Sequence, residues 1–510
     1  MPEGYLARMD ASATAALETP ESPALKNFRF SLDEPRLAAL AASPLLTPPA
    51  TAGNRRLQDR FFDTADYALA RKGITLRLRK NGRGLRLMLQ QDGKAVEVAT
   101  AAPEPELAAF GPEWQATLTN VLKDAPLREI ASASLRQITR ALGGASLVAE
   151  TGYLVAGGQK TPFSEMEMSG PPASLPDSAL ALAAGFPLRL QPEPLGKRAA
   201  RLAGGPPPGV QKSGAGLAGD LCLDEAVERI MRACLDQFVA NWPVFFEGDE
   251  VGAVHQMRVA MRRLRSALGL FNRALPTPEF AALRVEAKRI ASTMGEARNW
   301  DVFIAMLRDG PAAAFPDEAG FAALEAQCTA HRQAGYAQVR ALLDEPATTR
   351  FLLMAEAFIA RRGWRGGLPA ETLPRLAEPA KAFGTGSLER LYRKVRKRGK
   401  HLAKLSAHDR HRVRIELKKL RYAAEFFAKL FEPRQRVRQF NRAASSLQDE
   451  LGKLNDMATA EDLAKRLHGD SPEAIRALGI VLGWTAHATL GDPRAIASAW
   501  KEFRDVKPLA

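Results

Sequence analysis

Two stretches of this sequence carry the same unusual pattern of positive charge. Residues 255–265 read HQMRVAMRRLR and residues 411–421 read HRVRIELKKLR. The motif H-x-x-R-x-x-x-[RK]-[RK]-L-R therefore occurs twice without gaps, the second copy starting 156 residues after the first. One basic amphipathic segment could arise by chance, whereas two matching copies indicate an internal duplication. The fold must accommodate the same cationic element twice.

Each copy has the periodicity of an amphipathic helix. At 100° per residue, its charged positions fall within an arc of about 80°, and apolar positions fill the neighbouring arc. The first row comprises His255, Arg258, Arg262 and Arg265, next to Met257, Met261, Leu264 and Leu268. The second row comprises His411, Arg414, Lys418 and Arg421, next to Val413, Leu417, Leu420 and Ala424. We expect the apolar stripes to be buried.

Like charges three or four positions apart on a helix repel each other, and a bound anion would relieve that repulsion. Arginine offers paired donors to phosphate oxygens, and lysine adds a point charge. More cations precede the second copy, namely Arg393, Lys394, Arg396, Lys397, Arg398, Lys400 and Lys404. The alternative is that the rows are solvated helix faces. Among so many arginines, we expect the two histidines to be neutral hydrogen-bond donors. They could serve either a structural role or ligand contact, and the sequence favours neither.

The overall charge supports an anionic partner. Lys and Arg number 72 against 57 Asp and Glu, a formal net charge of +15. Such an excess is typical of proteins that meet nucleic acid, an anionic membrane or a phosphate polymer. The three cysteines lack metal-ligand spacing, the N-terminus lacks signal-peptide features, and the apolar stretch 477–490 is too short to span a bilayer. We expect a soluble, cytoplasmic protein without membrane association.

The chain divides at 203–219, AGGPPPGVQKSGAGLAG, which has the composition of an interdomain linker. Before it, residues alternate with period two. In 74–90, Ile74, Leu76 and Leu78 alternate with arginines, and in 162–168 Glu165 and Glu167 alternate with methionines. After it, the spacing is helical almost to the end. We expect an α+β multidomain fold, with 1–23 disordered, a β-barrel at 24–202, and helices at 220–510 repeated at about 220–370 and 380–510.

The helical half resembles the CHAD domain, the conserved histidine α-helical domain. The resemblance rests on both cationic strings together with TMGEARNWDVFIAML (293–307) and LQDELGKLNDMATAEDL (447–463). It implies a pseudo-twofold pair of four-helix bundles that binds inorganic polyphosphate, without a cofactor, on a central basic surface. It also implies an association with polyphosphate granules. The binding residues it implies are His255, Arg258, Arg262, Arg263, Arg265, His411, Arg414, Lys418, Lys419 and Arg421, to which we add Arg396, Lys397 and Lys400 from the basic stretch at 388–405. Arg298, Asp301, Asn455 and Asp456 stand at the family's other marked positions, where we favour interhelical hydrogen bonds.

The N-terminal half resembles the CYTH domain, the triphosphate tunnel fold. The resemblance rests on RFFDTADYALARKGITLRLRKNGRGLRLMLQ (60–90), TPFSEMEMSG (161–170) and PEPLGKRAARL (192–202). It implies an eight-stranded antiparallel tunnel in which basic side chains hold a triphosphate and glutamates hold Mg²⁺ or Mn²⁺ for its hydrolysis. The tunnel anion contacts implied are Arg29, Arg77, Arg79, Arg86 and Lys197. The remaining metal ligands implied are Glu165 and Glu167.

The sequence departs from the signature E-x-E-x-K with which that family begins. Leu25 and Asn27 stand where two metal-binding glutamates belong, Arg29 replaces the lysine, and Gln90 stands at a usually basic position. Hard divalent cations require carboxylate oxygens, so we expect weak metal binding and little triphosphatase activity. Glu165 and Glu167 could pair with the tunnel arginines instead.

Three functions remain for comparison. The first is non-catalytic polyphosphate binding with a degenerate tunnel, which we prefer. The second is an active, metal-dependent inorganic triphosphatase, and the third is nucleic-acid binding. We do not expect the third, because the rows contain no aromatic residues for base stacking and Tyr392 and Tyr422 are isolated. The sequence contains no P-loop, dinucleotide fingerprint or nucleophile elbow. Oligomeric state and polymer length are not given by the sequence.

Overall fold

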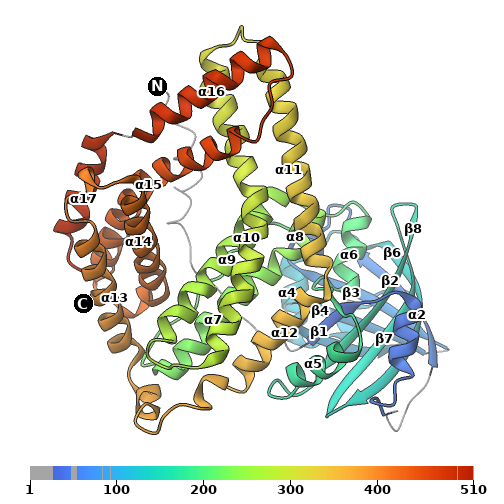
Figure 1. Cartoon of the computed structure of the whole chain (residues 1–510). Coiled ribbons are helices and arrows are strands. Elements are labelled where there is room, and N and C mark those ends of the chain that lie inside the picture. Colours follow the sequence, from blue (N-terminus) through green and yellow to red (C-terminus); the bar gives the residue numbers. More distant parts are fainter. Residues whose placement is uncertain (1–26, 48–53, 83, 92, 491, 509–510) are drawn as a thin grey trace.

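The computed structural model describes residues 27–47, 54–82, 84–91, 93–490 and 492–508. The expected disordered segment 1–23 and Leu25 lie outside these residues. A sheet domain comes first and a larger helical domain follows it (Figure 1), which confirms the predicted α+β class. In the described part of the chain, no helix is both long enough and apolar enough to cross a membrane.

The sheet domain contains one antiparallel sheet in the order β5-β4-β3-β2-β6-β7-β8-β1-β9. Its strands are β1 (Asn27–Ser31), β2 (Asn54–Asp63), β3 (Ile74–Asn81), β4 (Gly84–Gln91), β5 (Lys94–Thr100), β6 (Arg128–Leu142), β7 (Ala145–Ala156), β8 (Gln159–Ser169) and β9 (Arg189–Leu190). Its helices are α2 (Glu34–Ala41), α3 (Ala68–Arg71), η2 (Leu107–Ala109), α4 (Pro112–Leu122), α5 (Leu175–Gly185) and α6 (Leu195–Leu202). The short strand β9 brings the described number to nine instead of the eight that we expected.

The period-two pattern places apolar and charged side chains on opposite faces of this sheet. Ile74, Leu76 and Leu78 are buried on one face, as expected, and pack with α3 and α4. Arg79 of β3 reaches Glu150 of β7 at 3.4 Å although β2 and β6 lie between these strands. Neighbouring strands lie about 4.8 Å apart, so this contact requires the sheet to curl around its charged face. That face is therefore concave, and α6 packs against one part of it.

The helical domain repeats its elements. The first half contains α7 (Leu223–Ala240), α8 (Trp242–Glu247), α9 (Glu250–Phe271), α10 (Pro278–Leu307), η3 (Arg308–Ala312), α11 (Gly320–Asp344) and α12 (Pro346–Ala360). The short helices η4 (Gly363–Arg365) and η5 (Leu373–Ala377) connect the halves. The second half contains α13 (Ala380–Arg398), η6 (Leu402–Lys404), α14 (Ala407–Phe427), η7 (Ala428–Leu430), α15 (Arg434–Ala464), α16 (Pro472–Leu490) and α17 (Pro493–Asp505). Shifting α7, α9 and α10 by the 156 residues between the cationic strings places them within two residues of the bounds of α13, α14 and α15.

The two halves meet at two places. At one end they share a hydrophobic core, where Phe383 of α13 stacks on Phe271 of α9 and contacts Phe427 of α14 edge-on. Near the tips of α10, α11, α15 and α16, a second core contains Trp300, Cys328 and Val481. The helices diverge between these cores (Figure 1). The helices that carry the cationic strings, α9 and α14, contribute their apolar residues to the first core. The two cores therefore fix the position of one half against the other.

The linker at 203–219 is held against the helical domain. Asn241 at the end of α7 accepts a hydrogen bond from the Gln211 amide at 3.0 Å and donates to the Gln211 carbonyl at 2.8 Å. Leu217 is buried in the core that the two helical halves share. Although its composition is typical of a flexible linker, this segment is fixed to the helical domain by these contacts.

Helix α12 joins the two domains. Leu353 of α12 is buried in the hydrophobic cluster formed by β1, β7, β8, α2 and α5 of the sheet domain. Thr349 accepts a hydrogen bond from the Leu190 amide at 2.9 Å, and Arg350 donates to the Ala183 carbonyl at 2.9 Å. One helix of the helical domain thus completes the core of the sheet domain.

We therefore expect Leu353→Ala to lower the free energy of unfolding by about 2–5 kcal/mol, because it removes a buried side chain and leaves a cavity. Urea denaturation of the full chain, followed by circular dichroism, measures this change. Met354→Ala is the matched control, because Met354 is the next residue of α12 and is 46% exposed. Equal, small effects of both substitutions would contradict the shared core.

Candidate functional site

The two cationic rows lie on helices that pack against each other. The first row is on α9 and the second on α14, and these helices are in contact. Helix α9 is capped by Asp249, which accepts a hydrogen bond from the Gly252 amide at 2.8 Å. Helix α14 is capped by Ser406, which accepts one from the Asp409 amide at 3.1 Å. All eight residues of the predicted apolar stripes are fully buried. Because both stripes point into the shared core, their helices have a fixed rotation.

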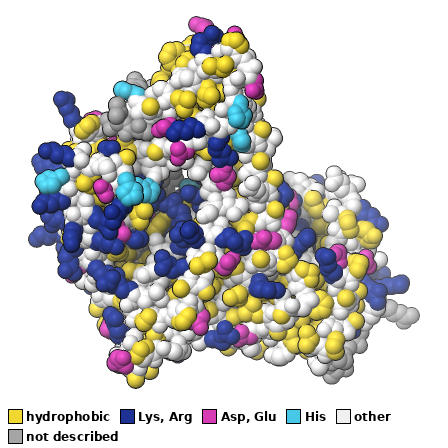
Figure 2. Space-filling model, viewed as in Figure 1, with side chains coloured by type: hydrophobic (Ala, Val, Ile, Leu, Met, Phe, Trp, Pro, Cys, Tyr) yellow, Lys and Arg dark blue, Asp and Glu magenta, His cyan; other side chains and the backbone are white. Residues whose placement is uncertain are grey.

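The rows approach each other closely enough for their charges to interact. Burial, together with repulsion from Arg262, Arg298 and Arg414, lowers the pKa of Arg258 to about 10. These neighbours lie on α9, α10 and α14. Figure 2 shows lysine and arginine side chains around the hollow between the two helical halves. The two rows thus form one convergent basic surface.

Lys418 lies at the centre of this surface. Burial and the charges of Arg262, Arg414 and Arg258 together lower its pKa to about 6, against the single opposing charge of Asp456. Arginine keeps its proton at neutral pH, so the lysine is the cation that gives up its charge here. The low pKa means that too few carboxylates lie near Lys418 to stabilise its charged form.

Few carboxylates neutralise the rows. Arg258, Arg262 and Arg265 form no ion pair with any described carboxylate, and Arg414 and Arg421 have only the longer contacts to Asp456 at 3.6 Å and Glu425 at 3.7 Å. The buried Nε atoms of Arg258, Arg414 and Arg421 have no hydrogen-bond partner among the described residues. Buried donors are nearly always paired in folded proteins. The Arg258 guanidinium is therefore held by packing without a paired carboxylate, and those of Arg414 and Arg421 are compensated only by these longer contacts.

Residues of α10 and α15 border the surface. His411 Nδ1 lies 2.8 Å from Asn455 Oδ1, so at least one of the two histidines makes an interhelical contact. Asp301 accepts hydrogen bonds from Arg332 and Tyr336, both at 2.8 Å, and lies 3.5 Å from Arg298. These contacts fit the interhelical role that we favoured for these positions.

The backbone of α10 leaves space for one arginine of the first row. A Cβ atom on Gly295 would lie 3.2 Å from Arg258 Nε. Glycine lets the Arg258 guanidinium lie directly on α10, whereas a larger residue would displace it.

Several predicted binding residues lie away from this surface. Arg263 is buried, donates to the Ser213 carbonyl at 2.7 Å and to Gln237, and therefore holds the linker instead of facing the second row. Lys419 shares Glu416 with Lys394 on the side of α14 that faces α13. Arg396, Lys397 and Lys400 are exposed at the end of α13. The repeat motif contains Arg263 and Lys419, but the rotation of α9 and α14 gives both residues other partners. Arg396, Lys397 and Lys400 lie on or just after α13, a helix that carries neither row.

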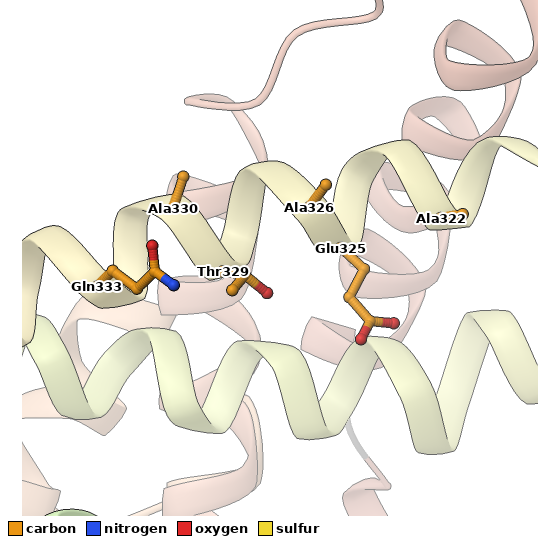
Figure 3. A pocket seen from close by; sticks show the side chains of 6 residues that line it. All are labelled: Ala322, Glu325, Ala326, Thr329, Ala330 and Gln333. Carbon is orange, nitrogen blue, oxygen red and sulfur yellow. The ribbon is translucent and has the colours of Figure 1, made fainter.

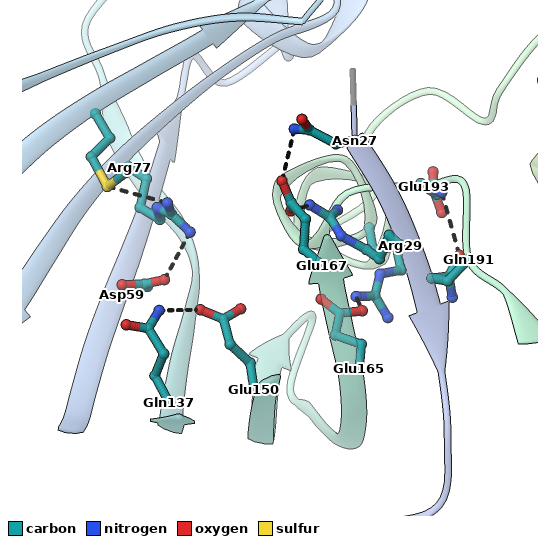
Figure 4. Close-up of polar contacts among 12 residues, drawn as sticks. Asn27, Arg29, Asp59, Arg77, Gln137, Glu150, Glu165, Glu167, Gln191 and Glu193 are labelled. Atoms are coloured by element: carbon teal, nitrogen blue, oxygen red, sulfur yellow. Dashed lines mark hydrogen bonds and ion pairs between the residues drawn. The ribbon is translucent and has the colours of Figure 1, made fainter. Parts of the chain in front are cut away.

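The concave face of the sheet domain has the opposite character, because its charges are paired with one another. Figure 4 shows Arg29 against Glu167 and Arg77 against Asp59. Asp59 is fully buried and also accepts from Arg79 Nε at 2.7 Å. Arg198 of α6 pairs with Glu165. Arg86, which is half exposed, lies 3.0 Å from Glu97.

Three of these partners, Asp59, Arg198 and Glu97, were missed in the sequence. Lys197 is exposed, and its neighbour Arg198 is the residue of α6 that reaches the concave face. Asp59 was not singled out, although its position opposite Arg79 in the register of β2 and β3 places it on the same face as the arginines. Burial raises the pKa of Glu165 in spite of the nearby charges of Arg198 and Arg29.

The residues present do not fit the divalent metal that the tunnel fold implies. Both predicted ligands, Glu165 and Glu167, are engaged by arginines, and Asn27 donates to Glu167 at 2.8 Å where a third carboxylate would be needed. Within the described ranges, no group of three or more His, Cys, Asp and Glu side chains is placed to hold a metal ion. A cation would have to compete with guanidinium groups for both carboxylates.

A shallow hollow on α11 is a separate feature. It is lined by Ala322, Glu325, Ala326, Thr329, Ala330 and Gln333 (Figure 3). Its lining contains no cation, so it does not extend the basic surface.

Comparison with known proteins agrees with this division of the chain. Residues 229–465 match the family model of the CHAD domain, and residues 30–182 match that of the CYTH domain. The crystal structure of the CHAD domain from the plant Ricinus communis is 30% identical, with a TM-score of 0.50, over 59% of this chain and 99% of that one. No curated protein matches the sequence.

Two further solved structures resemble parts of the chain more distantly. PptA from Streptomyces chartreusis is 18% identical over 55% of this chain and 100% of its own, with a TM-score of 0.42. HpAC1 from Hippeastrum, named as an adenylyl cyclase with a dominant triphosphatase activity, is 16% identical over 35% of this chain and 96% of its own, with a TM-score of 0.27.

The basic surface thus lies in a CHAD domain and the paired concave face in a CYTH domain. The chain belongs to the CHAD family, with a CYTH domain preceding the CHAD domain.

The lowered pKa of Lys418 predicts that the stability of the protein depends on pH. Between its folded-state pKa of about 6 and its ordinary value of 10.5, the folded protein binds fewer protons at this site than the unfolded chain. Stability therefore falls as the pH decreases through this window. We expect Lys418→Met to be more stable than the wild type at pH 7, with a larger difference at pH 6 than at pH 9.

Urea denaturation midpoints at the three pH values measure this difference. Lys419→Met is the matched control, because Lys419 pairs with Glu416 at 3.0 Å, and we expect no stabilisation from its loss. A Lys418→Met protein that is less stable than the wild type at pH 6 would contradict the view that burial and neighbouring cations destabilise charged Lys418.

Proposed function

We propose that this protein binds inorganic polyphosphate along the first and second rows of its CHAD domain. The observation that carries the proposal is the convergence of two duplicated cationic rows on one surface with few carboxylates. A chain of phosphates supplies closely spaced negative charge along a flexible backbone, so it can contact both rows at once. No cofactor is needed for this binding. A cytoplasmic location and an association with polyphosphate granules remain predictions from the family.

The character of the surface favours a plain phosphate polymer over nucleic acid. Proteins that bind single-stranded nucleic acid stack bases on accessible aromatic side chains. Tyr422, which directly follows the second row, and Tyr392 of α13 are buried, and Tyr392 donates to backbone carbonyls of Arg504 and Val506. Phe271 and Phe426, the aromatic residues that follow the two rows, are buried as well. The rows themselves contain only His, Arg and Lys. The surface therefore offers charge and phosphate donors without a means to contact bases.

For the CYTH domain we propose that metal-dependent triphosphatase activity has been lost. The support is the pairing of Arg29 with Glu167 and of Arg198 with Glu165, which satisfies the residues that would hold phosphate and metal. Breaking a buried ion pair leaves an uncompensated charge, which is strongly unfavourable. Binding of triphosphate and metal would have to separate these pairs first.

Replacing one arginine from each row tests polyphosphate binding. We expect Arg258→Ala/Arg414→Ala to weaken binding of long-chain polyphosphate at least about tenfold per arginine, because each substitution removes a charge-assisted hydrogen bond. The dependence of log K on log salt should also decrease by about one per lost contact. Fluorescence anisotropy with labelled polyphosphate, at several salt concentrations, measures both quantities.

Arg55→Ala/Arg56→Ala is the matched control, because it removes the same charge from exposed positions of β2. Equal affinity of all three proteins would place the binding site elsewhere. Failure of long-chain polyphosphate to displace bound nucleic acid at equal phosphate concentration would favour nucleic-acid binding instead.

A phosphate-release assay tests the CYTH domain. We expect no turnover of tripolyphosphate above background with Mg²⁺ or Mn²⁺, because arginines occupy both carboxylates that would bind the metal. Glu165→Ala and Glu167→Ala should give the same background. Rapid release that either substitution abolishes would show a working active site and overturn this part of the proposal.

A further inference from the structure

The first row does not end at Arg265. One turn further along α9 lies Gly269, and the guanidinium of Arg284 from α10 lies next to it, 3.5 Å from where a Cβ atom would stand. Burial and the charges of Arg284 and Arg262 lower the pKa of Arg265. Arg284 itself is exposed and pairs with no described carboxylate. The positive surface thus continues across Gly269 to a second helix.

The duplicated half provides an internal comparison. Gly269 corresponds to Glu425 when the chain is shifted by the 156 residues that relate the two rows. Glu425 Oε1 lies 3.7 Å from Arg421, which is the last cation of the second row. The second row therefore ends in a carboxylate, whereas the first row is open at the same position.

A further arginine cluster lies beyond the open end. Arg273 follows the end of α9, Arg375 is in η5, and Arg390 and Arg393 are one turn apart on α13. Burial lowers the pKa of Arg390, and the nearby charges of Arg273, Arg375 and Arg393 lower it further. The stacking of Phe383 on Phe271, with ring centroids 5.9 Å apart, holds α13 against the end of α9.

This cluster is also poorly neutralised. Glu378, at 3.5 Å from Arg375, is the one carboxylate that forms an ion pair with any of the four among the described residues. Arg393 Nε contacts only the Glu389 carbonyl, at 3.4 Å. Four cations so close together repel one another unless an anion lies between them.

We propose that a long polyphosphate chain leaves the two rows at the first-row end, passes over Gly269 and Arg284, and binds a second site formed by Arg273, Arg375, Arg390 and Arg393, here called the extension site. This inference rests on the proposed function and adds a length preference to it. A short chain fills the two rows alone, whereas a long chain also reaches the extension site. Affinity therefore increases with chain length, and the polymer continues in one direction only.

Gly269→Glu tests the path with little risk to folding. The new side chain reproduces Glu425 in the second half, its Cβ would meet only ordinary van der Waals contacts, and glutamate favours a helix more than glycine does. We expect a loss of about tenfold in affinity for long chains with a much smaller loss for tripolyphosphate, because the carboxylate neutralises and blocks the path. Gly269→Ala is the uncharged control and should bind both ligands like the wild type.

Arg273→Gln/Arg390→Gln tests the extension site itself. We expect long-chain affinity to decrease towards the affinity for tripolyphosphate, which should stay unchanged. The salt dependence of long-chain binding should decrease by about two, one for each lost contact. Isothermal titration with tripolyphosphate and with long-chain polyphosphate, at matched phosphate concentrations, measures these changes.

The outcomes separate the two proposals. If Gly269→Glu and Arg273→Gln/Arg390→Gln bind long chains as tightly as the wild type while Arg258→Ala/Arg414→Ala does not, the extension site is wrong and the proposed function stands. If Arg258→Ala/Arg414→Ala also binds normally, the proposed function fails. Equal losses for short and long ligands in Gly269→Glu would mean that the carboxylate acts on the two rows alone, which also contradicts the extension site.

Discussion

The helical domain depends on holding like charges together. Arg258 and Arg262 on one helix face Arg414 on another, and the repulsion among these arginines, which also favours loss of the Lys418 proton, opposes folding in the absence of an anion. The apolar stripes on the same two helices supply the opposing free energy, because they are fully buried in a core that both halves share. The arginines cannot turn away without exposing these stripes. Hydrophobic packing thus maintains an arrangement that electrostatics alone would disperse.

The two domains place arginine under opposite conditions. On the concave face of the CYTH domain, Arg29 and Arg79 meet carboxylates of the same chain, so the face is neutral without a ligand. On the CHAD surface, Arg258 meets mainly other cations. The number of arginines is therefore a poor guide to anion binding. What distinguishes the two places is whether the chain supplies the negative partner itself.

The helical wheel predicted which residues of α9 and α14 are buried and which form the rows, because a periodic apolar stripe fixes the rotation of a helix. The wheel left Arg263 out of the first row and the family resemblance added it. Neither could show its partner, since only the path of the linker gives Arg263 its acceptor at Ser213. The strand alternation placed Glu165 and Glu167 on one face correctly. Their arginine partners come from β1 and α6, and such pairings depend on the curl of the sheet, which a local pattern does not contain.

The seating of Leu353 inside the CYTH domain has a consequence for how this architecture can be divided or recombined. A fragment cut at the glycine- and proline-rich segment would leave an apolar depression on the sheet domain and remove the linker contacts at Asn241. A sheet domain transferred alone to another protein would therefore expose an apolar surface that favours aggregation. The unit that can be moved between proteins includes α12, more than a hundred residues beyond the apparent boundary.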